Sequence, residues 1–198
     1  MQKIKIALCD EDKFYCERFA AYMMNHKAQE IELNIYSTVE QFTGDEKMGS
    51  FDLVIANHML FYCEDLSQTC REVARVLKKS GRFICSTYGK KHMKEVSELA
   101  KGFDNRIVLS ADNLYEKFGK ENGKEILKPY FHEISWQEYK DKLEIQDAEP
   151  LIAYILSCHG NQNQYILSRY QEFRDYVKQK AGKGYDVTKE AGIFVCRK

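Results

Sequence analysis

The segment Phe-Asp-Leu-Val-Ile-Ala-Asn at residues 51–57 decides the fold class, because a strand is predicted over 51–56 and the sequence changes character on either side of it. Upstream, the continuous apolar run Ile4–Cys9 is typical of a strand buried on both faces of a parallel sheet. Downstream, apolar residues recur at helical spacing before another predicted strand at 82–87. The sequence therefore predicts a doubly wound, mostly parallel α/β sheet with right-handed crossovers.

The same patterns predict the other elements. Further strands are expected at 31–35, 106–109, 131–136, 142–145 and 192–196. Helices are expected at 13–26, near 38–42, and at 65–79, 93–101, 113–118, 148–158 and 164–180. A loop is expected at 44–50, Ser80 and Gly81 are expected to stop the helix before them, and both prolines are expected just before elements. We expect three layers, with a helical insertion before the last strand.

Length and charge narrow the class of protein. The 198 residues suit a single α/β domain, and Lys plus Arg equals Asp plus Glu at 30 each, without a strongly basic block. Nucleic acid is therefore not expected as a partner. No apolar run approaches the roughly 18 residues of a membrane span, and the first run breaks at Asp10, so we expect a cytoplasmic protein without a membrane partner. The oligomeric state is left open.

The seven cysteines are predicted to be reduced, mostly buried thiols. Their number is odd and they form no Cys-x-x-Cys pair. Two pairs are each seven residues apart, and Cys158 precedes His159, but no second close pair of ligands accompanies them. We therefore interpret the cysteines as residues of helices and of the core, in preference to ligands of a structural zinc site.

Residues 1–50 resemble the opening of a response-regulator receiver domain, because the strand Ile4–Cys9 ends in an acidic cluster of Asp10, Glu11 and Asp12. The resemblance implies a magnesium site at Asp10 and Glu11, and oxygen ligands at a strand end suit that ion. The position of the phosphate-accepting aspartate is occupied by Asn57, whose amide cannot form an acyl phosphate, so phosphorelay signalling is not expected. The alternative is that the carboxylates only begin the following helix.

Residues 51–198 resemble the back half of a class I S-adenosylmethionine-dependent methyltransferase. The resemblance is carried by Phe-Asp-Leu-Val-Ile-Ala-Asn-His-Met-Leu at 51–60 and by Val-Leu-Lys-Lys-Ser-Gly-Arg-Phe-Ile at 76–84. It implies S-adenosylmethionine as cofactor, with Asn57, His58 and Met59 beside it. Ligands of open α/β sheets bind beyond the carboxyl ends of the strands, which agrees with that placement. His58 is either a general base or part of the pocket wall.

Other features of such enzymes differ here. The turn after the first strand, Cys-Asp-Glu-Asp-Lys at 9–13, has no glycine, and Tyr-Ser-Thr at 36–38 supplies no acidic residue after the second strand. The region of about 110–182 corresponds to a cap that selects a small-molecule methyl acceptor. Aromatic and histidine side chains are candidates for pocket lining: Phe61, Tyr62, Tyr88, His132, Trp136, Tyr139 and His159.

The two resemblances meet at residues 50 and 51 and share one architecture, a hybrid of Rossmann-like and flavodoxin-like sheets. A natural recombinant, a gene remnant and a built chimaera would all give such a chain. The leading interpretation is methyl transfer from S-adenosylmethionine to an unknown small acceptor. The alternatives are a non-enzymatic receiver-like module that binds a partner near Asp10 and Asn57, and a folded scaffold without a ligand.

Overall fold

A computed structural model describes residues 3–26, 30–38, 41, 47–109, 113–182 and 184–198. The chain forms two compact units. The first comprises 1–87, 120–137 and 192–198, and the second comprises 88–119 and 138–191. Each is described by itself. Most of the helix expected near 38–42 and residues 44–46 of the expected loop lie outside the described residues, whereas 47–50 form a turn as expected.

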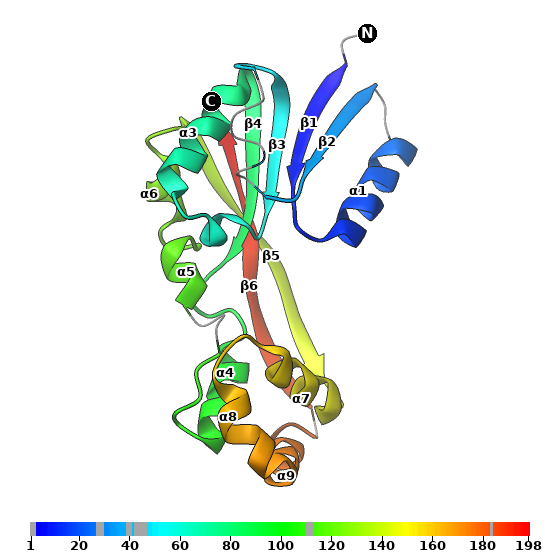
Figure 1. Ribbon diagram of the computed structural model, residues 1–198, viewed down its shortest axis with the longest axis vertical. Coiled ribbons are helices and arrows are strands. Elements are labelled where there is room, and N and C mark those ends of the chain that lie inside the picture. The colour runs from blue at the N-terminus through cyan, green and yellow to red at the C-terminus, as the bar shows by residue number, and fades with distance from the viewer. Residues whose placement is uncertain (1–2, 27–29, 39–40, 42–46, 110–112, 183) are drawn as a thin grey trace. The chain divides into compact units, whose positions relative to one another are not determined.

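A six-stranded sheet with the order β2-β1-β3-β4-β6-β5 confirms the predicted fold class (Figure 1). β1 pairs in parallel with both β2 and β3, and β3 pairs in parallel with β4. Helices cover the sheet in the three-layer arrangement that the sequence predicts. The strands are β1 (Ile4–Cys9), β2 (Ile31–Tyr36), β3 (Phe51–Asn57), β4 (Leu77–Tyr88), β5 (Glu133–Ile145) and β6 (Tyr185–Arg197).

Helix α1 (Lys13–Asn25) covers one face of the parallel strands. The buried Cys16 packs with Ile6 and Leu8 of β1 and Ile55 of β3. Successive side chains of a strand point to opposite faces, so the alternate residues Ile6 and Leu8 share this face. The helix begins where Asp12 Oδ1 accepts a hydrogen bond from the Tyr15 amide at 3.0 Å.

The helix predicted at 65–79 is shorter than expected. α3 ends at Val76, and Leu77 is already extended, fully buried and paired with Phe51 of β3. Burial of two large apolar side chains in the sheet outweighs the tendency to continue the helix. Gly81 does not stop a helix but lies within β4, where a Cβ atom would come within 2.9 Å of the Lys78 carbonyl oxygen.

The rest of the first unit comprises η1 (Leu60–Tyr62), α6 (Gly123–Leu127) and parts of the long strands. The two strand-like segments predicted at 131–136 and 142–145 are one continuous strand, β5. The predicted last strand is likewise longer and starts at Tyr185. β4, β5 and β6 each contribute residues to both units.

The second unit is helical, and three of its helices lie between β5 and β6, as the predicted insertion requires. The helix expected at 164–180 is divided into α8, η3 and α9. The bounds are α4 (Lys94–Phe103), α5 (Leu114–Lys117), α7 (Ala148–Ser157), α8 (Gln162–Ile166), η3 (Leu167–Arg169) and α9 (Tyr170–Ala181). Phe173 of α9 is fully buried in an apolar core to which α4, α7 and α8 also contribute. Pro150 lies inside α7 rather than before it, in the first turn, where the missing amide costs no helical hydrogen bond.

The strand predicted at 106–109 does not form. Asn161 takes the place of a neighbouring strand: its Oδ1 accepts from the Val108 amide at 2.8 Å, and its Nδ2 donates to the Arg106 carbonyl at 3.0 Å. Its own amide donates to the Val108 carbonyl at 3.2 Å. No helix within the described residues has the length and apolar character needed to cross a membrane.

Candidate functional site

The strand order reverses at β1, which lies between β2 and β3. The chain moves from β1 to β2 at one side and later to β3 at the other, so the carboxyl ends of β1 and β3 flank the switch point where such sheets bind ligands. Cys9 pairs with Ala56 across these strands. Asp10 and Asn57 are the residues that follow this pair, one on each side of the switch point.

His58 follows β3 in a left-handed backbone conformation, with φ +48°. Such a conformation in a residue other than glycine costs about 1 kcal/mol or more and persists where the surroundings enforce it. Here the His58 amide donates a 2.9 Å hydrogen bond to Ser86 Oγ, near the end of β4. The strained turn leaves Asn57 half-buried and the His58 side chain exposed, whereas Met59 is buried.

The pKa of His58 is lowered from its ordinary value of 6.5, because the surrounding protein partly desolvates the imidazole even though the residue keeps contact with solvent. The negative charge of Asp10 acts on the ring in the opposite direction and partly offsets this shift. Asp10 and His58 therefore interact electrostatically across the switch point. A neutral imidazole at pH 7 is able to accept a proton.

The acidic cluster after β1 has mainly a local structural role. Asp10 Oδ1 accepts from the Asp12 amide at 2.9 Å, and Asp12 caps helix α1. Glu11 is exposed. Within the part of the chain that the structure describes, no group of three His, Cys, Asp or Glu side chains is arranged to hold a metal ion. The magnesium site predicted at Asp10 and Glu11 thus receives no support, and the alternative that the carboxylates begin a helix is realised at Asp12.

The aromatic residues Phe61, Tyr62 and Tyr88, which were predicted to line the cofactor pocket, differ in burial. Phe61 is buried with its ring centroid 6.2 Å from that of His58, and Tyr62 packs edge-on against Phe61 at 4.7 Å while remaining 60% exposed. Tyr88 is buried and stacks on His92 at 5.0 Å, in the second unit. Phe61 is therefore an aromatic neighbour of the switch-point histidine.

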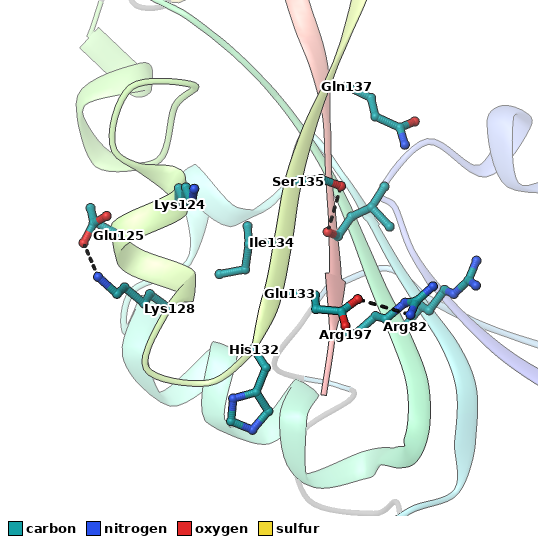
Figure 2. A pocket seen from close by; sticks show the side chains of 11 residues that line it. Arg82, Lys124, Glu125, Lys128, His132, Glu133, Ile134, Ser135, Gln137 and Arg197 are labelled. Atoms are coloured by element: carbon teal, nitrogen blue, oxygen red, sulfur yellow. Dashed lines mark hydrogen bonds and ion pairs between the residues drawn. The ribbon is translucent and has the colours of Figure 1, made fainter.

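A cavity of about 750 Å³ opens in the first unit, along β5 and away from the switch point (Figure 2). Of the four side chains predicted to line a pocket in the cap, His132 does so here, whereas Trp136 packs on Phe194 at 4.8 Å. Sequence reasoning missed Arg82 and Arg197, because an arginine on a strand carries no motif. Arg82 opens the strand predicted at 82–87, and Arg197 directly follows the strand predicted at 192–196.

The protein class is indicated by a family model for a methyltransferase domain, which matches residues 16–85. The match includes Asn57, His58 and Met59 and begins well before residue 51. The front of the chain from residue 16 onward therefore shares in the methyltransferase likeness, and the comparisons give no support to a receiver-like front half or to a chimaera.

The particular relatives are as follows. Over 61 residues the chain is 40% identical to a malonyl-[acyl-carrier protein] O-methyltransferase of Gallionella capsiferriformans, a match that spans 31% of this chain and 21% of that relative. A S-adenosylmethionine-dependent methyltransferase from Archaeoglobus fulgidus superposes with a TM-score of 0.57 at 10% identity, covering 98% of this chain and 86% of that one. YcgJ from Bacillus subtilis superposes with a TM-score of 0.51 at 15% identity, covering 99% of this chain and 91% of that one. These structures establish a common fold.

Proposed function

We propose that this chain binds S-adenosylmethionine at the switch point between β1 and β3 and transfers its methyl group to a small acceptor. The observation that carries the proposal is the methyltransferase-domain match, because it contains the end of β3 and the residues after it, Asn57, His58 and Met59. The position of these residues at the strand-order reversal supports the same conclusion.

The residues at the crevice suit the cationic parts of this cofactor better than its carboxylate. The cofactor supplies a methyl group activated by a positively charged sulfonium. Asp10 presents a half-buried carboxylate whose charge already acts on His58, and it favours a nearby ammonium or sulfonium. The turn at 9–13 has no glycine, so backbone approach to the cofactor is less close than a glycine would allow.

His58 is the proposed general base. Its lowered pKa leaves the imidazole neutral near pH 7, and its exposed side chain is open to an acceptor. Bound S-adenosylmethionine would supply an activated methyl group to the acceptor's oxygen or nitrogen and leave as the thioether, and His58 would take up the proton that the acceptor releases. Ser86 holds the His58 amide and so positions the residue. Selection of the acceptor by the region of about 110–182 is part of this proposal.

Calorimetric titration tests cofactor binding. S-adenosylmethionine and its product S-adenosylhomocysteine are each titrated into the wild-type protein and into Asn57→Ala and His58→Ala, with His159→Ala in the second unit as a matched control. We expect micromolar binding that both crevice variants weaken at least roughly tenfold, and that His159→Ala leaves unchanged. Absence of binding by a protein that unfolds cooperatively would contradict the proposal.

The charge of Asp10 gives a sharper test. If its carboxylate attracts the sulfonium, S-adenosylmethionine binds more tightly than the uncharged thioether of the product, and Asp10→Asn removes the difference. A parallel magnesium titration tests the receiver-like alternative, which requires binding that depends on Asp10 and Glu11. Magnesium binding without cofactor binding would favour that alternative.

A further inference from the structure

We propose that the cavity lined by Arg82 and Arg197 binds the phosphate group of a small organic phosphate, at a site separate from the switch point and independent of the proposed methyl transfer. The cavity belongs entirely to the first unit. Its volume of about 750 Å³ lies in the range of ligand pockets.

The two arginines project from neighbouring strands, β4 and β6, and β5 follows β6 at the sheet edge. Arg82 is in register with Leu53, whose side chain packs beside α1, so Arg82 lies on the same sheet face as that helix. Figure 2 shows Arg82, Arg197 and Glu133 together at one side of β5, with α6 at the other. The lining residues are Arg82, Lys124, Glu125, Lys128, His132, Glu133, Ile134, Ser135, Gln137, Val195 and Arg197.

The cavity carries an uncompensated positive charge. Each of its two carboxylates forms an ion pair with one cation: Glu133 lies 3.1 Å from Arg197, and Glu125 lies 3.6 Å from Lys128. Arg82 and Lys124 have no ion pair within the described residues. Arg82 on β4 therefore adds a positive charge beside the Arg197–Glu133 pair of β6 and β5 (Figure 2). A bound anion would neutralise this charge.

Phosphate is the anion that this donor set suits best. A guanidinium presents a planar fork of N–H donors that binds two oxygens of one phosphate, so two arginines engage a dianion from two directions. The Gln137 amide adds a neutral donor on β5, whereas the Ser135 hydroxyl donates to the Val195 carbonyl oxygen at 3.5 Å. Glu133 competes for Arg197, and the arginines are exposed, so binding is expected to be moderate and to weaken with salt.

The experiment is a calorimetric titration at low salt with inorganic phosphate, glucose 6-phosphate, glucose and succinate. Wild type is compared with Arg82→Gln, Arg197→Gln and the matched control Arg71→Gln, which removes an exposed arginine of α3 outside the cavity. We expect glucose 6-phosphate to bind, each cavity variant to weaken it at least tenfold, and Arg71→Gln to change it less than twofold. Thermal unfolding of each variant establishes that it is folded.

Several outcomes would overturn the proposal: no binding of either phosphate, equal binding of succinate, or affinity unaffected in the folded Arg82→Gln protein. If inorganic phosphate bound as tightly as the sugar phosphate, the proposal of an organic ligand would be overturned, and the cavity would be a site for free phosphate. A short single-stranded oligonucleotide that binds more tightly, with the same dependence on Arg82, would replace the small molecule with nucleic acid. Glucose is expected not to bind.

Discussion

The imidazole of His58 responds to one nearby charge, and that response is measurable. Asp10 raises the pKa of His58 against the larger lowering by desolvation, so Asp10→Asn should lower the pKa of His58 further. Proton NMR titration of the His58 ring, assigned with His58→Gln, provides the measurement. An unchanged or raised pKa in Asp10→Asn would show that the two side chains do not interact, and Glu11→Gln is the control for a general change of charge.

The same shift links His58 to stability. Its pKa in the folded protein lies below the unfolded value of 6.5, so the unfolded chain takes up a proton first as the pH falls. The stability that neutral His58 contributes is present above pH 6.5 and is lost as the pH falls below it. We therefore expect His58→Gln to unfold in urea with a smaller loss of stability between pH 7.5 and pH 5.5 than wild type. Equal losses would contradict this assignment.

At this scale the sequence predicts where along a strand a residue lies better than it predicts backbone conformation. The methyltransferase resemblance pointed to Asn57, His58 and Met59, and the structure brings the strand end that carries them to the switch point. The left-handed turn at His58 was not predictable, because few residues other than glycine adopt this conformation and the hydrogen bond to Ser86 comes from a distant part of the chain. Residue-level geometry here depends on tertiary contacts.

Among the elements, helix α1 depends on a side-chain cap. The Asp12 carboxylate accepts from the Tyr15 amide, so Asp12→Ala should lower the free energy of unfolding by about 1 kcal/mol, whereas Asp12→Asn should cost much less. Urea unfolding followed by circular dichroism measures both. The neighbouring exposed Glu11→Ala serves as control and should be nearly neutral. An equal loss in both alanine variants would point to a general charge effect instead of a cap.

Asn161 should contribute more to the free energy of unfolding than an average surface amide. It makes three hydrogen bonds to residues 106–108, and Asn161→Ala removes the two side-chain bonds, at a cost of about 2 kcal/mol. The matched control is Asn163→Ala, because the Asn163 side chain makes a single 3.2 Å bond, to Leu156. Hydrogen exchange of the Val108 amide should accelerate in Asn161→Ala alone. Equal exchange in both variants would show that Asn161 does not hold this segment.

The helices and strands that were predicted wrongly also depend on contacts between distant parts of the chain. The run at 106–109 is apolar enough for a strand, but its backbone partner is an asparagine that no local pattern connects to it. The helix at 65–79 was extended too far because Leu77 fits both its apolar stripe and a buried strand. Strands β1, β2 and β3 were predicted nearly to the residue, since their runs are bounded by acidic or polar turns.

For the whole molecule, the sequence predicted one fold class but left two families open. Alternation of strands and helices fixes a doubly wound sheet regardless of which family supplied it, and two families with this architecture matched the same central strand. The methyltransferase-domain match over residues 16–85 runs across residues 50 and 51, so it gives no support to a boundary there. A short acidic motif after a first strand is weak evidence for a family, because helix capping alone accounts for Asp12.

The thiols provide a test of packing across the molecule. The seven cysteines are free; six are buried and Cys158 is half-buried. Burial raises the pKa of Cys70 and of Cys196 to about 12, so these side chains are neither accessible nor thiolate near pH 8. Ellman's reagent should therefore modify one thiol quickly in the native protein and all seven after unfolding. In Cys158→Ser the fast phase should disappear. Several fast thiols in the folded protein, or a fast phase that persists in Cys158→Ser, would mean that the core around these cysteines opens readily.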